Sequence, residues 1–285
     1  MSAEPGPKVL FINLERSIDR RGHMEGELGR VGLVFERVAG IPGADLPDRF
    51  KPYFCTPDGQ LASPLKLGEV GCHAAHLAAY ERFLAGSEAT ALVLEDDVHL
   101  PADLAPLLAR ILAKLPADWD IVRLSNTPKR AYVPLDTIAD GYHLVRYSKV
   151  PTLASAYLLS RAGARKLLAP GLRVHAIDEY LRRPWLMDLD TFGVVPPPIR
   201  LMSFDSNIDA FEDRRRQPKI GVIRKTLGKA DLANFPKRLG FDMRNIGIVR
   251  WSACLAINAA DKLARRISGR TLIYRLAPLL KRSGM

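Results

Sequence analysis

The stretch ALVLEDDVHL, residues 91–100, carries the strongest signal for the fold of this chain. Its four apolar residues predict a buried central strand, which ends on three consecutive carboxylates, Glu95, Asp96 and Asp97. In open α/β sheets, ligands bind beyond the carboxyl ends of the strands. We therefore expect these carboxylates to line a ligand site at that edge of the sheet.

Adjacent carboxylates repel one another, and a bound divalent cation relieves that repulsion. Mg²⁺ and Mn²⁺ favour one or two carboxylates combined with the oxygens of a bound phosphate, so the acidic run predicts a site for either ion. A solvated acidic turn is the simpler interpretation of the same residues. A phosphohydrolase of the haloacid-dehalogenase type also places acids after a strand, but it needs a lysine partner that this sequence does not clearly provide.

The segments on both sides of this strand alternate between strand and helix patterns. The alternation predicts an α/β fold with a mainly parallel sheet and flanking helices. Residues 41–67 are rich in Pro, Gly and Asp and predict a long irregular loop. The further strands are predicted at 8–12, 35–39, 120–124 and 155–159, and the helices at 69–84, at 161–168 and in the charged stretch up to residue 31.

The net charge of +11 on the 285 residues is unevenly distributed. Residues 211–285 hold 18 Lys or Arg against 5 Asp or Glu, so the preceding part is close to neutral. We predict an α/β domain over residues 1–210 and a basic helical extension over 211–285. Three widely spaced cysteines indicate a reducing compartment, and the lack of a signal-peptide pattern or a long apolar run predicts a cytoplasmic location.

Two further stretches contain residues suited to binding. FINLERSIDRR, residues 11–21, ends the first strand on Asn13 and continues with Arg16, Asp19 and Arg20. Arginine suits planar, bidentate binding of phosphate, so we expect one or two of these side chains to contact a nucleotide and the others to lie on a charged helix surface.

The second stretch is LGEVGCHAAHL, residues 67–77, at the start of a predicted helix. His73 and His76 are three positions apart and share one helix face. They could serve as zinc ligands, but no third ligand is obvious nearby, so a structural role is the favoured interpretation.

Taken in order, these stretches resemble glycosyltransferase family 25, the lipopolysaccharide and lipooligosaccharide glycosyltransferases. One position departs from the family pattern: Ala75 stands where the family usually has a serine before His76, which puts details of donor binding in doubt. The motifs that carry the resemblance are N-L-x-R-S-x-D-R at 13–20, E-x-G-C-x-x-x-H at 69–76, L-E-D-D-V at 94–98, W-D-I-V-R-L at 119–124, S-A-Y-L-L-S-R-A-G-A at 155–164, the isolated Asp178, and P-P-x-x-x-x-S ending at Ser203.

The resemblance implies a GT-A-like fold and an inverting enzyme that moves a hexose, most simply galactose from UDP-galactose, onto a lipopolysaccharide, lipooligosaccharide or other surface glycan. Asp97 is expected to ligate Mn²⁺ or Mg²⁺, with Glu95 and Asp96 near the ribose or metal-bound water. An inverting transferase needs one base for the acceptor hydroxyl, for which Asp178 is the candidate and Glu179 the alternative. The expected donor-binding residues are Asn13, Arg16, Asp19, Arg20, His76, Glu95 and Asp96.

The basic extension has apolar residues at helical intervals from Trp251 to Leu280. An amphipathic basic helix of this kind is predicted to lie in the interface of an anionic membrane, where a lipid-linked acceptor would be held. Packing of the helix on the α/β domain is the alternative. The extension lacks a recognisable nucleic-acid module, so nucleic acid is not expected as a partner. A catalytically degenerate, membrane-associated glycan-binding protein of the same fold is the competing hypothesis for the function.

Overall fold

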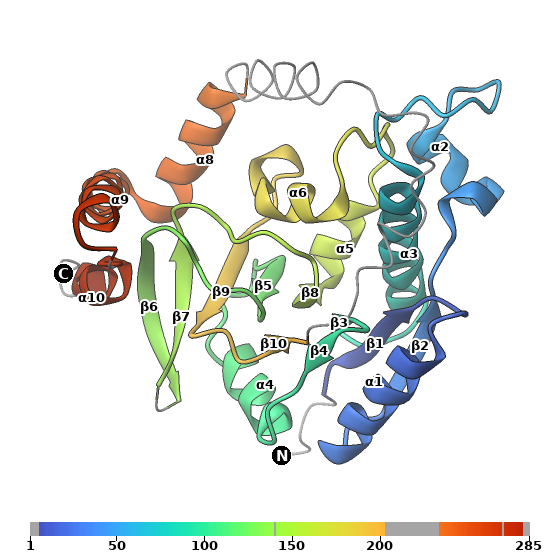
Figure 1. Cartoon of the computed structure of the whole chain (residues 1–285), viewed down its shortest axis with the longest axis horizontal. Helices are drawn as coiled ribbons and strands as arrows, with labels where there is room; N and C mark the ends of the chain where they lie inside the picture. The colour runs from blue at the N-terminus through green and yellow to red at the C-terminus, as the bar shows by residue number, and fades with distance from the viewer. Residues whose placement is uncertain (1–5, 140, 203–233, 270, 282–285) are drawn as a thin grey trace.

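The computed structural model describes residues 6–139, 141–202, 234–269 and 271–281 (Figure 1). Its centre is an eight-stranded sheet in the order β2-β1-β3-β8-β5-β9-β7-β6. A small second sheet pairs β4 (Val98–His99) with β10 (Arg200–Leu201) in antiparallel fashion. The strands of the large sheet are β1 (Lys8–Asn13), β2 (Phe35–Ala39), β3 (Thr90–Glu95), β5 (Ile121–Arg123), β6 (Tyr132–Ala139), β7 (Tyr142–Tyr147), β8 (Ala156–Ser160) and β9 (Thr191–Val195).

The large sheet confirms the α/β class, with two strands reversed. β1 pairs in parallel with β2 and β3, and β5 pairs in parallel with β9. β8 lies antiparallel between β3 and β5, and β7 lies antiparallel between β9 and β6. The strands other than β7 and β8 therefore share one direction, which brings the carboxyl ends of β1 and β3 to the same edge.

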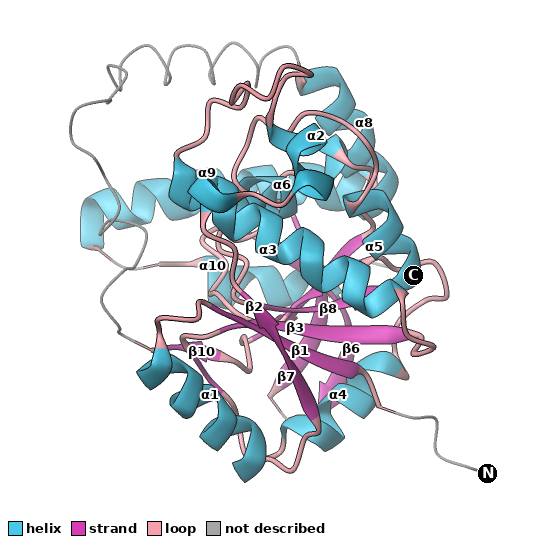
Figure 2. Ribbon diagram, turned by 90° about the vertical axis from the view of Figure 1, so that its right-hand side faces the viewer, coloured by secondary structure: helices cyan, strands magenta, loops and turns pink. Residues whose placement is uncertain are grey.

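Helices cover both faces of the sheet, because its strands alternate their apolar side chains. Val9 and Phe11 of β1 pack with α1 and α4, whereas Leu10 and Ile12 face the opposite cluster under α3 and α5. Figure 2 shows α1 and α4 below the sheet and α3, α5 and α6 above it. The helices of this part are α1 (Ile18–Arg30), α2 (Lys51–Phe54), α3 (Leu67–Leu84), α4 (Leu104–Leu112), α5 (Arg161–Leu167) and α6 (Ile177–Arg182).

Residues 41–67 were expected to be an irregular loop, and up to the start of α3 at Leu67 they form α2, two short 3-10 turns and one isolated bridge between Cys55 and Leu61. The loop lies close to α3 because of Gly71. A Cβ atom added at Gly71 would overlap the carbonyl oxygen of Ile41, so the approach requires a glycine here. The glycine of the E-x-G-C motif therefore has a packing role in this fold.

The described part of the C-terminal extension forms α8 (Phe235–Ile246), α9 (Ile248–Ser268) and α10 (Ile273–Leu276). Its apolar side chains cover β6 and β7: Ile273 packs with Tyr132 and Tyr147, and Cys254 is buried with Val133. The packing alternative for this extension is thus present in the structure. Residues 203–233, which contain the first part of the extension, lie outside the described residues.

The expectation of one apolar face from Trp251 to Leu280 is corrected by the structure. The helix ends at Ser268, where Gly269 adopts a left-handed conformation, and the chain then turns back. Trp251 lies partly buried against the sheet, whereas Leu263 and Ile267 are 59% and 77% exposed. The apolar residues of α9 are therefore divided between an inner face and an outer face.

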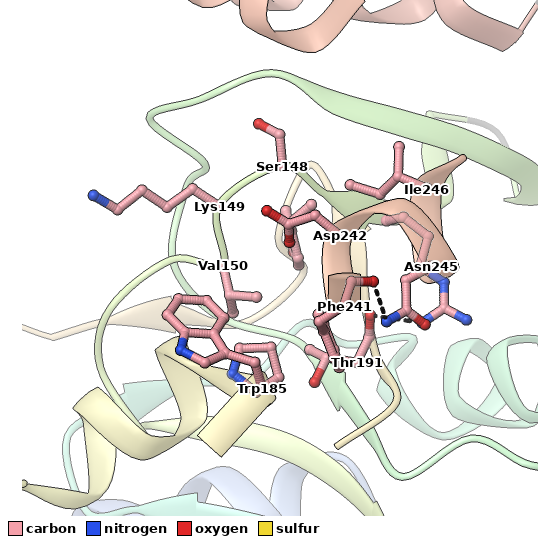
Figure 3. Close-up of a pocket in the computed structure, with 12 residues that line it drawn as sticks. Ser148, Lys149, Val150, Trp185, Thr191, Phe241, Asp242, Asn245 and Ile246 are labelled. Atoms are coloured by element: carbon pink, nitrogen blue, oxygen red, sulfur yellow. Dashed lines mark hydrogen bonds between the residues drawn. The ribbon is translucent and has the colours of Figure 1, made fainter. Parts of the chain in front are cut away.

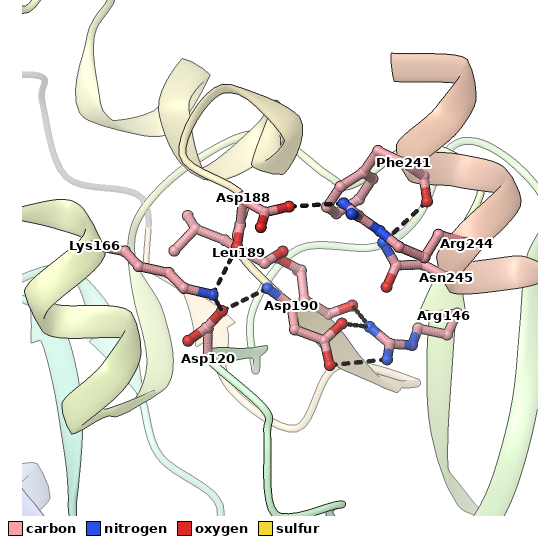
Figure 4. Close-up of polar contacts among 10 residues, drawn as sticks. Asp120, Arg146, Lys166, Asp188, Leu189, Asp190, Phe241, Arg244 and Asn245 are labelled. Atoms are coloured by element: carbon pink, nitrogen blue, oxygen red, sulfur yellow. Dashed lines mark hydrogen bonds and ion pairs between the residues drawn. The ribbon is translucent and has the colours of Figure 1, made fainter. Parts of the chain in front are cut away.

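Ionic contacts join the elements around the start of β9 (Figure 4). The buried Asp120 accepts hydrogen bonds from the Lys166 ammonium and from the backbone N–H of Asp190. Arg146 of β7 binds the Asp190 carboxylate. Arg244 of α8 contacts Asp188 at 2.7 Å, which ties the extension to the α/β domain.

Candidate active site

The acidic run lies where the carboxyl ends of β1 and β3 meet. Asn13 is 1% exposed, and its amide donates to the Asp96 carboxylate at 2.7 Å. Arg20, near the start of α1, donates to the other oxygen of Asp96 at 3.1 Å. Arg37 of β2 in turn donates to the Asn13 side-chain oxygen at 3.1 Å. Two partners therefore hold Asp96 in a defined orientation.

Asp97 differs from Asp96 because one of its oxygens is unsatisfied. Its Oδ1 is buried and has no hydrogen-bond partner among the described residues. Burial, followed by the charges of Glu95 and Asp96, raises the pKa of Asp97 from its usual 3.8 to about 6. A buried carboxylate oxygen without a hydrogen-bond partner is costly, and a metal ion removes that cost. Asp97 thus fits the role of a divalent-metal ligand.

Glu95 lies at the end of a chain of buried side chains. Its carboxylate contacts His76 Nε2 at 3.4 Å and accepts a hydrogen bond from Ser155 Oγ at 2.9 Å. The other ring nitrogen of His76 is 2.8 Å from the Tyr157 hydroxyl. Burial raises the pKa of Glu95, but the hydrogen bonds and charge of these partners outweigh it and lower the pKa overall. Glu95 is therefore held as an anion.

Cys72, His76 and Glu95 also form a possible cation cluster, since their ligand atoms lie within 4.8 Å of one another. Burial raises the pKa of the Cys72 thiol well above its usual value, and nearby carboxylates raise it further. A thiol held protonated is a poor ligand, and a sulfur and nitrogen set favours softer ions than Mg²⁺ or Mn²⁺. The oxygen atoms of Asp97 suit these two ions better.

The two candidate bases, on the first turn of α6, differ in their partners. Glu179 forms ion pairs with Arg182 at 2.7 Å and Arg183 at 3.3 Å. Asp178 is partly buried, and burial followed by the charge of Glu179 raises its pKa, with a smaller contribution from Glu95. A carboxylate with a raised pKa accepts a proton more readily. Asp178 therefore has the environment of a base, whereas Glu179 has that of an ion-pair partner.

A buried arginine is a feature that the sequence interpretation missed. Arg123 of β5 is fully buried, and its Nη2 donates to the carbonyl oxygens of Thr152 and Leu153. Its Nε and Nη1 have no hydrogen-bond partner among the described residues. Burial lowers the Arg123 pKa, and the charge of Asp178 raises it. The available signal was a single arginine inside the apolar run of residues 121–124.

The remaining residues considered in the sequence lie outside the cluster around Asp97. Arg16 and Asp19 are exposed on the surface that precedes and begins α1. His73 is 2% exposed and lies edge-on to Phe54 and Tyr180, and burial lowers its pKa to about 3. His73 is accordingly a neutral core residue. The structure brings together Asn13, Arg20, His76, Glu95, Asp96 and Asp97, with Asp178 electrostatically coupled to Glu95.

A conserved-domain comparison agrees with this arrangement. The family model described as glycosyltransferase family 25 (LPS biosynthesis protein) matches residues 7–181, so the chain belongs to this family. The matched region includes both ends of the site, from Asn13 to Asp178. The α/β sheet with helices on both faces agrees with the fold class that the resemblance to this family implied.

Curated relatives whose names give different roles match about three fifths of the chain. The chain is 31% identical over 192 residues to the inactive glycosyltransferase 25 family member 3 of Homo sapiens, covering 61% of this chain and 31% of that protein. It is 27% identical over 192 residues to procollagen galactosyltransferase 1-A of Xenopus laevis, covering 61% and 30%. The chain thus spans about 30% of the length of the curated relatives that it matches.

Among solved structures, the chain aligns with a glycosyltransferase involved in the glycosylation of the major capsid of PBCV-1. The alignment has a TM-score of 0.33 and 12% identity, and it covers 71% of this chain and 95% of that chain.

Proposed function

We propose that this chain is a metal-dependent, inverting glycosyltransferase that moves a hexose from a nucleotide-sugar donor to a glycan acceptor. The observation that carries the proposal is the unpaired, buried oxygen of Asp97 beside two carboxylates that have protein partners. Galactose from UDP-galactose is the proposed donor, in line with the printed name of the Xenopus relative. The proposed acceptor is a lipopolysaccharide, lipooligosaccharide or other surface glycan, in line with the family description.

The roles of the side chains follow from their partners. Asp97 would hold Mn²⁺ or Mg²⁺, which supplies positive charge to the leaving diphosphate when bound. Asn13 and Arg20 hold Asp96 in place, and Asp96 would contact the ribose or the metal-bound water. Glu95, kept anionic by His76 and Ser155, adds a second fixed negative charge beside it.

Asp178 is the proposed base. The acceptor hydroxyl oxygen forms a bond to the anomeric carbon of the sugar as the bond from that carbon to the diphosphate oxygen breaks. The hydroxyl proton passes to the Asp178 carboxylate, and the nucleoside diphosphate leaves on the opposite face of the sugar. Displacement from one face and departure from the other invert the anomeric configuration. The electron pair of the broken bond stays on the diphosphate, so no second protein acid is required.

The test is a screen of UDP-sugars for transfer or hydrolysis, with Mn²⁺, with Mg²⁺ and with excess chelator. We expect turnover of one UDP-hexose that requires the metal. Full turnover in excess chelator would contradict the metal role. If the chain neither turns over nor binds any UDP-sugar, the transferase proposal is contradicted.

A catalytically degenerate glycan-binding protein is the second candidate, because several curated relatives carry the word inactive in their names. The two candidates differ in turnover and not in binding. A chain that binds UDP and glycan with an intact Asp97 but hydrolyses no donor with either metal would support the second candidate.

We further propose that the protein acts at the cytoplasmic side of an anionic membrane. None of the described helices is long and apolar enough to span a membrane. The outer face of α9, however, exposes Ile248 at 58%, Val249 at 71%, Leu263 at 59% and Ile267 at 77%. Lys262 and Arg266 are exposed on the same helix. Apolar residues flanked by basic ones suit the interface of an anionic bilayer, where each basic residue adds about 1 kcal/mol.

Vesicle sedimentation tests this location. The full chain should sediment with phosphatidylglycerol vesicles at low salt and less with phosphatidylcholine vesicles, and Leu263→Gln/Ile267→Gln should reduce sedimentation. Val34→Gln is the matched control. Val34 is also an exposed apolar residue, at 92%, but it lies between α1 and β2 and not on α9. Equal sedimentation of the two variants would contradict a role for α9.

A further inference from the structure

A small cavity beside α6 has a strongly basic lining. Its volume is about 80 Å³, and its walls come from the second residue after β7, the end of α6, the turn η3 (Pro184–Leu186) and the start of α8. The lining residues are Lys149, Arg182, Arg183, Trp185, Asn234 and Arg238. Four of these six side chains are cations, and none is a carboxylate.

The nearby carboxylates do not balance the charge of this cavity. Glu179 pairs with Arg182 and Arg183, and Asp242 pairs with Arg238 at 3.4 Å. No carboxylate of the described chain forms an ion pair with the Lys149 ammonium. Burial lowers the pKa of Lys149, and the charges of Arg182 and Arg238 lower it further. The cations crowd one another, and an anion in the cavity would relieve their repulsion.

An uncharged donor is also available at this place. The Nε1 of Trp185 is buried and has no hydrogen-bond partner among the described residues. A second small cavity adjoins the first and shares Lys149 and Trp185 with it. Figure 3 shows these two side chains on one side of the second cavity, away from Asn245 and Ile246. The Arg238 guanidinium lies 5.3 Å from the centre of the Trp185 ring, which limits the directions it can take. Positive charge thus coincides with an unused N–H group.

The position of the cavity relates it to the candidate base. Arg182 is one helical turn after Asp178 on α6, so the cavity and the candidate base are carried by the same short helix. The acidic run belongs to the β3–β4 turn instead, and none of its residues lines the cavity. In both Figure 1 and Figure 2, α6 lies between α8 and β3. The metal and diphosphate would occupy the β3 side, which leaves the α8 side for the acceptor.

We propose that this cavity is an acceptor subsite that binds an oxyanion, a phosphate or carboxylate group carried by the glycan. The proposal rests on the transferase function above and narrows the acceptor to an anionic glycan. Arg182, Arg183 and Arg238 provide planar donors suited to oxyanions, and Lys149 supplies the unpaired charge. Binding of the oxyanion positions the neighbouring sugar hydroxyl next to Asp178.

Direct binding separates this proposal from the function of the whole site. Inorganic phosphate and acetate are titrated into the full chain by calorimetry, and we expect saturable binding of at least one of them. Lys149→Gln should weaken binding roughly tenfold, the size expected for loss of one charge-assisted contact. Lys149→Gln/Arg238→Gln should weaken it further. The matched control is Lys262→Gln/Arg266→Gln, which removes two positive charges from the exposed face of α9.

The thermal midpoint of each variant guards against a folding artefact, since Arg238 pairs with Asp242 whereas Lys149 forms no ion pair within the part of the chain that the structure describes. The proposal is overturned if neither phosphate nor acetate binds. It is also overturned if Lys149→Gln binds the anion as tightly as the control pair does. These outcomes do not depend on catalysis, so they can be read even if no donor is turned over.

Kinetics then test the assignment to the acceptor. With a donor that the wild-type chain turns over, Lys149→Gln should raise KM for a phosphorylated acceptor about tenfold relative to KM for the same acceptor without phosphate. The KM for the donor should stay at the wild-type value. An equal rise for both acceptors, or a rise confined to the donor, would overturn the acceptor assignment while leaving the transferase function in place.

Discussion

The acidic turn after β3 and the basic cavity beside α6 share one feature with opposite sign of charge: each gathers like charges, most of which have protein partners. In the turn, Asp96 and Glu95 have protein partners, and Asp97 keeps an unsatisfied oxygen. In the cavity, the arginines have carboxylate partners, whereas Lys149 forms no ion pair with a carboxylate of the described residues. Unpaired charge is costly in a folded chain, so its presence at both places indicates ligands of opposite sign. The comparison assigns a cation to one region and an oxyanion to the other.

The largest effect should come from removing the unpaired charge of the acidic turn. Asp97→Ala is expected to lose several kcal/mol of transition-state stabilisation, about 10³-fold or more in kcat/KM. Metal binding, measured by Mn²⁺ paramagnetic resonance, should weaken in parallel. The same substitution should leave phosphate binding at the basic cavity unchanged. Wild-type activity in Asp97→Ala would remove the basis for assigning a cation to this turn.

The next effect distinguishes the two carboxylates of α6. Asp178→Asn keeps the shape of the side chain but removes its capacity to accept a proton, so kcat should fall by roughly 10²–10⁴-fold. Donor binding should persist. Glu179→Gln should have a smaller effect, because Glu179 is engaged with Arg182 and Arg183. If Glu179→Gln is the inactive variant and Asp178→Asn is not, the base is the neighbouring residue.

Stability should change in opposite directions for an unpaired and a paired carboxylate. The folded pKa of Asp97 is about 6 against a usual 3.8, so the folded state binds the proton more tightly than the unfolded state. Ionisation of Asp97 therefore destabilises the folded state. The full effect is present above about pH 6, and it disappears as the pH falls to about 3.8, where the side chain is protonated in the folded state. In excess chelator at pH 7.5, Asp97→Asn should stabilise the chain by about 1–3 kcal/mol.

Glu179→Gln, under the same conditions, should destabilise the chain by about 1 kcal/mol, because it breaks partly exposed ion pairs. Urea unfolding measures both variants. The gain from Asp97→Asn should disappear near pH 4 and reverse when saturating Mn²⁺ stabilises the wild type. A loss of stability in Asp97→Asn without metal would show that the carboxylate has a partner that the structure does not provide.

The smallest effect concerns the contact between the extension and the α/β domain. Arg244→Gln removes the 2.7 Å ion pair with Asp188, whose side chains are 66% and 70% exposed. An exposed pair of this kind contributes at most about 1 kcal/mol. Ile273→Ala, which opens a space in the apolar cluster under β6 and β7, should cost about 2–5 kcal/mol. Comparable losses for the two variants would show that charge, and not apolar contact, holds the extension in place.

Much of the strand and helix framework could be predicted from local patterns. The buried strand before Glu95, the first strand ending at Asn13 and the helix that carries His76 all occur where the apolar periodicity placed them. β6 and β7 were not predicted, because their sequences have mixed polarity and long-range pairing determines which side chains are buried. β9 was not predicted either, because it is only five residues long and contains a glycine. The reversal of β8 was also not predicted, since a short apolar run is compatible with either direction.

By itself, the sequence determined the α/β class and the presence of three acids at a strand end, because apolar periodicity and residue order are local properties. Only the tertiary structure decided which acid lacks a partner, because Asn13 and Arg20 reach Asp96 from a segment more than 70 positions away in the chain. It also decided that α9 divides its apolar residues between the sheet and the surface. The basic cavity depends on tertiary structure for the same reason. Lys149, Arg182 and Arg238 are isolated basic residues in the sequence, and only the packing of α6 against α8 concentrates their charge around one small volume.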